Sequence, residues 1–266
     1  MEDFKYLKDN KNLIIAQKKS AMKKADAVSF IYSATDKSGA EIKSITDTPF
    51  EEIGVINVKV VINTTNVLDS HNDCHIPGLW KKTLKESRLL YLLDNHNLCF
   101  DDVISDEVKA STQTVTFKEL GSNLSGSTEA LIFDAIVRAE RNEDMFKAYY
   151  KGWVKNHSVG MQYVNLFLCI NSEEKYYAEE KANWDKYYPM VANKEVADER
   201  GCFWVVTEAK LIEGSAVVIG SNHITPTLSV SEVPAETTPK SEPFKNTLTK
   251  LETEQIIKES FNKIKN

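Results

Sequence analysis

The stretch VKNHSVGMQYV, residues 154–164, places a histidine directly before a serine. Its β-branched and aromatic residues predict a strand, which we expect to run to about Ile170. Successive side chains of a strand point to opposite faces of the sheet, so His157 and Ser158 face away from each other. The face of His157 is mostly apolar, which predicts a partly buried strand histidine. If Ser158 is a nucleophile, its base must come from elsewhere in the fold.

Gly160 shares the face of Ser158 in this predicted strand. A glycine inside a strand marks either a β-bulge or a place where another backbone approaches closely. In the second case, the approaching backbone would be an extended peptide that adds along the edge of the sheet. The sequence leaves both interpretations open.

The bulk composition favours a globular protein of one large domain or two small ones. The chain has 266 residues, of which 42% are hydrophobic and 27% are charged. A net charge of -6 argues against a nucleic-acid partner, because phosphate contacts need a basic surface. The N-terminus is polar and no apolar run is long, so we expect neither a signal peptide nor a membrane span. The four cysteines lack CxxC spacing, which favours free thiols in a reducing cytosol.

Changes of composition along the chain predict three parts. Residues 1–26 are lysine-rich with helical spacing and are expected to form an N-terminal helical arm. Residues 27–223 contain a series of strand-like runs and form the predicted domain, with a charged, tyrosine-rich helical insertion at 172–200. Residues 224–266 comprise a Pro/Ser/Thr/Glu-rich linker, expected to be disordered, and an amphipathic helical tail. A helical period at 140–154 predicts one more helix, directly before the quoted strand.

One histidine outside the quoted stretch is placed to serve as a base. His96 ends the run LLYLLDNHN, residues 89–97, and an apolar strand gives the rigid support that a catalytic group needs. An unperturbed histidine has a pKa of about 6.5, which suits both a general base and a general acid. Asp94 lies two residues earlier, so strand geometry would put it on the face of His96. Asp94 is therefore a candidate for the group that orients the histidine.

Four segments, taken together, resemble the prohead (capsid maturation) serine protease family of tailed phages, which is related in fold to herpesvirus assemblin. They are NTTNVLDSHNDCHIPGLWKKTL, LLYLLDNHN, NEDMFKAYYKGWVKNHSVGMQYV and AKLIEGSAVVIGSNHITPT, and they cover about 63–225. Each motif is weak by itself, and the resemblance depends on their order and spacing. The chain departs from the family pattern where Gly220 and Ser221, rather than Pro and Ala, precede Asn222. The insertion also looks longer than the family pattern, and the N-terminal arm lies outside it.

The resemblance implies a fold, a site and a function. The implied fold is α+β, with a β-barrel-like antiparallel core flanked by helices, as in the herpesvirus protease. The implied catalytic residues are Ser158 as nucleophile, His96 as base and Glu213 as third member, with Asp94 as competitor for that last role. An oxyanion hole would come from backbone N–H groups or from an upstream arginine, for which Arg138 and Arg141 are candidates.

The implied activity is that of a serine endopeptidase which needs no cofactor and no metal. It would cleave scaffold protein, the major capsid protein and other prohead proteins, and also itself. It would act in the host cytoplasm, inside the assembling viral prohead, without a nucleic-acid or membrane partner. The resemblance also leaves room for a homo-oligomer. The tail could tether the protease to scaffold or capsid.

Two alternatives belong to other classes of protein. One is a non-catalytic capsid-assembly or scaffold protein that retains the protease fold. The other is a metal-binding β-domain, because the loop DSHNDCHIPG, residues 69–78, holds five side chains that can ligate zinc: Asp69, His71, Asp73, Cys74 and His75. Their spacing matches no zinc motif, so the sequence favours a polar loop.

Overall fold

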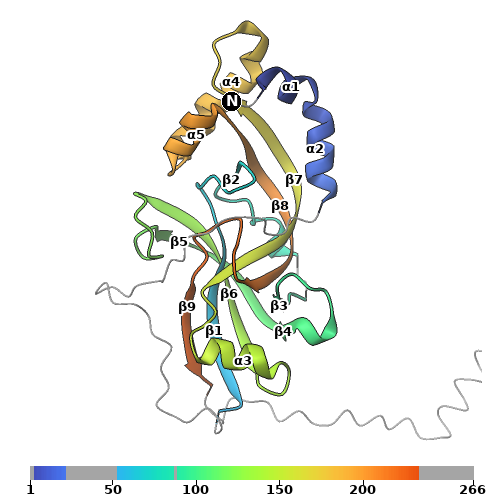
Figure 1. Cartoon of the computed structure of the whole chain (residues 1–266), viewed down its shortest axis with the longest axis vertical. Coiled ribbons are helices and arrows are strands. Elements are labelled where there is room, and N and C mark those ends of the chain that lie inside the picture. Colours follow the sequence, from blue (N-terminus) through green and yellow to red (C-terminus); the bar gives the residue numbers. More distant parts are fainter. Residues whose placement is uncertain (1–2, 22–52, 87–88, 234–266) are drawn as a thin grey trace, which may run out of the picture. The chain divides into compact units, whose positions relative to one another are not determined.

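The computed structural model describes residues 3–21, 53–86 and 89–233, which form an α+β fold (Figure 1). The α+β class predicted from the sequence is confirmed. The first part of the predicted domain, residues 27–52, and the predicted tail helix lie outside the described residues. One compact unit extends to Glu232 and holds all the elements described below.

The first sheet is antiparallel and has the strand order β5-β6-β1-β9. Its strands are β1 (Val55–Thr64), β5 (Glu107–Thr116), β6 (Ser127–Arg138) and β9 (Thr227–Glu232). The composition predicted a linker at β9, and that prediction is wrong for these residues. Within the Pro-rich segment, TLSVSE alternates apolar and polar residues, and this short period-2 pattern suits a strand at the edge of a sheet.

The second sheet is mixed and has the order β2-β8-β3-β4, with β7 also paired to β8. Its strands are β2 (Asp73–His75), β3 (Leu92–Asp94), β4 (Val103–Ser105), β7 (Asn156–Ile170) and β8 (Cys202–Val217). β7 runs antiparallel to β8, whereas β2 and β3 run parallel to it. The predicted β-barrel-like antiparallel core is wrong. No ladder joins the two sheets within the described residues, and two of the pairings in the second sheet are parallel.

The helices flank these sheets. They are α1 (Phe4–Asp9), α2 (Lys11–Ser20), α3 (Glu143–Tyr150), α4 (Ala178–Tyr187) and α5 (Lys194–Arg200), with 3-10 turns at Thr83–Lys85, Phe100–Asp102, Lys175–Tyr177 and Tyr188–Met190. The predicted helix before β7 is confirmed as α3, which begins where the Asn142 side chain accepts a hydrogen bond from Met145 N. α4 and α5 lie within the predicted helical insertion.

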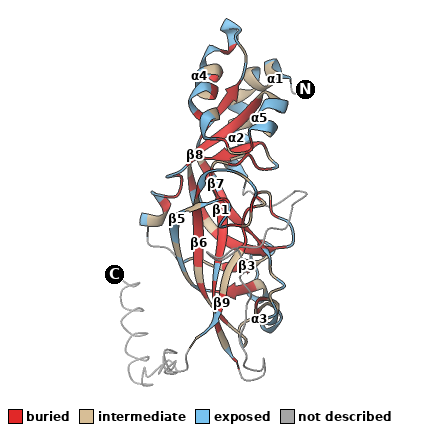
Figure 2. Ribbon diagram, turned by 90° about the vertical axis from the view of Figure 1, so that its left-hand side faces the viewer, coloured by how far each residue is buried: buried red, intermediate tan, exposed pale blue. Residues whose placement is uncertain are grey.

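One face of the second sheet packs against the first sheet, and we call it the inner face. Val159 of β7 and Leu92 of β3 both pair with Gly214 of β8 and belong to the main core together with Ile62 and Phe133 of the first sheet. Much of β1, β6, β7 and β8 is buried, as the red colour in Figure 2 shows. A Cβ on Gly214 would lie 2.6 Å from Phe133, so only glycine allows this close packing. We call the opposite side, which bears Ser158 of β7 and Ser215 of β8, the outer face.

Lysines dock the N-terminal helices onto the domain. Lys18 of α2 pairs with Asp73 at 2.5 Å, and Lys8 and Lys11 pair with Glu180 of α4 at 2.5 and 2.7 Å. Both carboxylate side chains are fully buried, at 0% exposure. Charges taken out of water must be paired, so these helices are an integral part of the fold rather than a loose arm.

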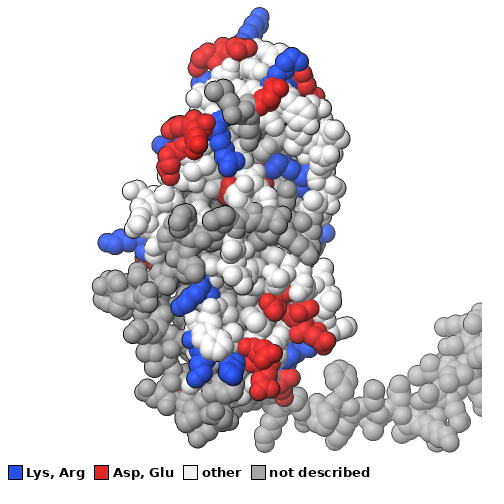
Figure 3. Space-filling view, viewed as in Figure 1, with Lys and Arg blue, Asp and Glu red and all other residues white. Residues whose placement is uncertain are grey.

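The face of the molecule seen in Figure 3 carries charges of both signs. Basic and acidic side chains lie interspersed on this face. In the part of the chain that is described, no helix combines the length and the apolar character that crossing a membrane would require.

Candidate functional site

His96 follows the end of β3, where the backbone turns over the outer face. Asn95 and His96 have positive φ angles of 49° and 59°, a conformation that is uncommon outside glycine. Asn95 N donates a hydrogen bond to Ala216 O at 2.9 Å, and His96 N donates one to Ser215 Oγ at 3.1 Å. These two bonds hold the left-handed turn and place His96 beside the hydroxyl of Ser215.

Glu213 fixes the histidine ring. His96 Nδ1 lies 2.7 Å from Glu213 Oε1, and both side chains are almost completely buried. An ionised carboxylate only accepts hydrogen bonds, so Nδ1 carries the proton and Nε2 of a neutral ring is an acceptor. The second carboxylate oxygen, Oε2, accepts a bond from Ser215 Oγ at 2.7 Å. Ser215 thus ties the backbone of His96 to the carboxylate of Glu213.

Ser158 lies on the same face of the sheet. It pairs directly with Ser215 across β7 and β8, and residues opposite each other in a ladder share a face. The Nε2 atom of His96 is buried and has no hydrogen-bond partner among the residues described, so no bond joins it to Ser158. A buried polar atom without a hydrogen-bond partner costs about 1–3 kcal/mol of stability. A catalytic role is one reason for a protein to keep such an atom.

Asp94 lies on the other side of the sheet. It pairs with Ala216, which also pairs with His157. The expectation that Asp94 shares the face of His96 is wrong, because β3 ends at Asp94 and the left-handed turn breaks the alternation. Burial raises the pKa of Asp94, and the charge of Asp102 acts in the same direction. The group that contacts the His96 ring is Glu213.

His157 has a structural role. It is fully buried: Nδ1 donates to Thr225 O at 3.0 Å, and Nε2 accepts from the Tyr149 hydroxyl at 2.9 Å. The prediction of a partly buried strand histidine that faces away from Ser158 is confirmed, with burial that is complete. Burial lowers the pKa of His157 to about 4.

The low pKa of His157 predicts that its ring stays neutral in mild acid. In ¹⁵N-detected NMR, we expect an Nδ1–H tautomer that does not titrate between pH 7 and about pH 5. The folded pKa lies below the unfolded value, so the stability contributed by neutral His157 is complete above about pH 6.5 and is lost as the pH falls toward 4. Titration of this ring near pH 6.5 in the folded protein would contradict its burial.

The candidate oxyanion arginines are not brought to Ser158 by any contact shown. Arg138 lies at the end of β6 and pairs with Glu107 at 2.7 Å. Arg141 lines a surface pocket with Arg138 and Glu140, between the start of β5 and the end of β6. Backbone N–H groups are the remaining source of donors that the sequence suggested.

The polar loop at 69–78 is held by hydrogen bonds. Asp69 Oδ1 accepts from the backbone N–H groups of His71 and Asp73, each at 2.9 Å. Asp73 accepts from Tyr163 and pairs with Lys18, while His75 bonds to Asn63 at 2.8 Å. No group of three or more metal-ligating side chains occurs in the described ranges, and burial raises the pKa of the Cys74 thiol. The polar-loop interpretation fits residues 69–72, whereas Asp73–His75 form the buried strand β2.

Gly160 and the turn after β8 lie in two of the segments that resemble the prohead-protease pattern. Gly160 pairs with Glu213, and the ladder shifts register directly after it. The extra residue at this shift is Ile212 of β8, so the sheet has a bulge beside Gly160, on the neighbouring strand. Gly220 is required by packing, because a Cβ there would lie 2.9 Å from His157 O. Asn222 ties this turn to β1 through a bond to Thr64 O at 2.8 Å.

The sequence reasoning missed Ser215. Its position two residues after Glu213 places it on the same strand face, a signal that the period-2 rule could have provided. The tertiary contact with the His96 backbone has no such signal.

Comparison with known proteins adds no assignment. No family model, no curated protein and no solved structure matches this chain.

Proposed function

We propose that this chain is a serine endopeptidase of the prohead-protease type, in which Ser158 is the nucleophile, His96 the general base and then acid, and Glu213 the orienting carboxylate. The observation that carries the proposal is the bond from His96 Nδ1 to Glu213. It leaves Nε2 as a buried proton acceptor on the face that bears Ser158.

The reaction would follow from these positions. Ser158 Oγ attacks the carbonyl carbon of the scissile bond while its proton passes to His96 Nε2. Glu213 accepts a hydrogen bond from Nδ1 throughout and stabilises the imidazolium. His96 then protonates the leaving amine, and an acyl-enzyme forms at Ser158. Water, deprotonated by His96, hydrolyses that ester and restores the serine. Backbone N–H groups would bind the oxyanion, and the loss of one such donor costs about 10²–10³ in rate.

The biological setting of the proposal comes from the sequence resemblance. The substrates would be scaffold protein, the major capsid protein and the chain itself, in a prohead that assembles in the host cytoplasm. A fold related to herpesvirus assemblin belongs to the same proposal, although the described strands form two sheets and close no barrel.

One observation favours the alternative of a non-catalytic capsid-assembly protein. Ser158 and His96 are 5% and 2% exposed, and no hydrogen bond links them in the described structure. Catalytic hydrogen bonds often tighten only when substrate binds, so the observation does not remove the enzyme proposal.

Processing of a co-expressed substrate separates the two functions. We expect the wild-type chain, produced together with the capsid protein of its own virus, to yield shortened fragments, and Ser158→Ala to yield none. Ser172→Ala is the matched control, because Ser172 lies beyond the far end of β7. Identical fragments from wild type and Ser158→Ala would show that this serine is not the nucleophile.

A further inference from the structure

A row of side chains crosses the outer face next to the candidate site. Ser158 of β7 pairs with Ser215 of β8, and Ser215 pairs with Leu93 of β3. Adjacent strands lie about 4.8 Å apart, so Leu93 lies roughly 10 Å from Ser158 across the sheet. The segment that follows β3 carries His96, and its residues Leu98, Cys99 and Phe100 lie around one pocket with Leu93.

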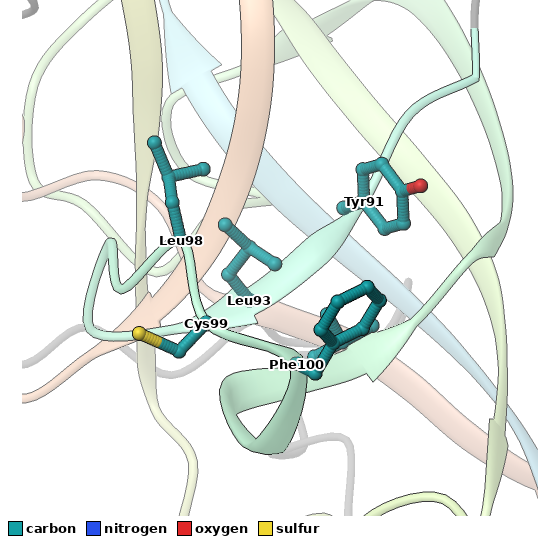
Figure 4. A pocket seen from close by; sticks show the side chains of 6 residues that line it. Tyr91, Leu93, Leu98, Cys99 and Phe100 are labelled. Carbon is teal, nitrogen blue, oxygen red and sulfur yellow. The ribbon is translucent and has the colours of Figure 1, made fainter.

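Residues before, within and after β3, together with the start of β4, form this apolar pocket (Figure 4). Its lining residues are Tyr91, Leu93, Leu98, Cys99, Phe100 and Val103, and its volume is about 160 Å³. A cavity of about 150 Å³ with a similar lining can hold benzene, so this pocket has room for one leucine, methionine or phenylalanine side chain. Leu98 and Phe100 are 68% and 86% exposed, so they border an open mouth.

The position of the pocket points to a peptide as its occupant. An extended chain advances about 3.3 Å per residue, so roughly 10 Å corresponds to about three residues. A peptide whose scissile bond lies at Ser158 can therefore reach the pocket with a side chain three positions away. Asp101 and Asp102, directly after Phe100, place negative charge beside the mouth, which would attract a basic neighbour of the inserted residue.

We infer that this pocket is a specificity subsite, which takes a large apolar side chain of the substrate about three residues from the scissile bond and prefers a lysine or arginine next to it. The inference rests on the proposed endopeptidase function. The C-terminal segment of the chain itself contains such a pair, Phe244 followed by Lys245. A peptide with the sequence of residues 238–252 is therefore the probe.

Cys99 allows the pocket to be blocked without disturbing the core. It is exposed and lines the pocket, whereas the other three cysteines, Cys74, Cys169 and Cys202, are buried. We expect wild-type protein to cut the peptide about three residues from Phe244, and N-ethylmaleimide to lower kcat/KM by roughly 10- to 100-fold. The Cys99→Ser variant should cut equally well with and without the reagent. A Phe244→Asp peptide should be cut as slowly as the wild-type peptide is cut by alkylated protein.

A binding measurement distinguishes failure of the subsite from failure of the enzyme assignment. In the uncleaving Ser158→Ala variant, the peptide should shift the methyl NMR signals of Leu93, Leu98 and Val103, and the Phe244→Asp peptide should not. Cleavage that depends on Ser158 but is indifferent to Phe244 and to alkylation of Cys99 would overturn the subsite and leave the protease standing. Methyl shifts without any cleavage would support the pocket and count against the protease. Neither shifts nor cleavage would overturn both.

Discussion

Loss of either Ser158 or His96 should reduce peptide cleavage by as much as about a millionfold, and loss of both should reduce it no further. The nucleophile is weak without its base, and the base has no proton to accept without the nucleophile, so the two groups act as one unit. Ser215 pairs with Ser158 across the ladder and accepts a hydrogen bond from the backbone of His96, so both proposed groups lie beside it. The measurement is kcat/KM for Ser158→Ala, His96→Ala and the double variant on one peptide substrate.

The control for this comparison must separate catalysis from folding. Ser172→Ala should keep full activity, and circular dichroism should show that all the variants remain folded. Additive losses, with the double variant far below either single one, would mean that Ser158 and His96 contribute independently. That result would contradict the proposed pair.

Replacing Lys18 with methionine should destabilise the protein by about 3–5 kcal/mol at neutral pH. The change leaves the buried carboxylate of Asp73 without its cation, although Tyr163 still donates a bond to it at 2.8 Å. Chemical denaturation monitored by fluorescence would measure the loss. Lys5→Met is the matched control, because the pair of Lys5 with Asp9 is exposed and contributes little.

The deficit of Lys18→Met should shrink as the pH is lowered. Burial and the neighbouring charge of Asp69 raise the pKa of Asp73 even though Lys18 opposes them. A carboxyl whose folded pKa is raised favours the fold below its unfolded pKa, and this contribution is lost as the pH rises through the folded value. Without Lys18 that folded pKa rises further, so protonation relieves more of the cost. A deficit that stays constant between pH 7 and about pH 4 would contradict a charged, buried Asp73.

Local pattern was sufficient to predict much of the fold. The strand at β7, the opposed faces of His157 and Ser158, helix α3 and the helices of the insertion follow from periods of two and of about 3.6 residues. These features are encoded by neighbours in sequence. The segment of β9 was misread because its composition outweighed a six-residue alternation.

Non-local pairings were beyond the reach of the sequence. The parallel contacts of β2 and β3 with β8 involve strands of three residues each, too short for any periodicity. The same limit applies to the site. His96 and Glu213 are 117 residues apart. The turn that brings them together depends on left-handed backbone at Asn95 and His96. Both residue types are enriched in that conformation, but the apolar strand pattern before them gives no sign of it. The period-two rule placed Asp94 on the face of His96, but β3 ends at Asp94, two residues before His96, and the rule does not hold beyond the strand.

Labelling with a fluorophosphonate tests the central claim most directly, because these reagents react only with a serine that a neighbouring base has activated. Peptide mass mapping of the labelled wild-type protein should place the adduct on Ser158. The same experiment on His96→Ala should give no adduct, and labelling of Ser172→Ala should match wild type. An unlabelled Ser158, or an adduct that forms equally well without His96, would contradict the account.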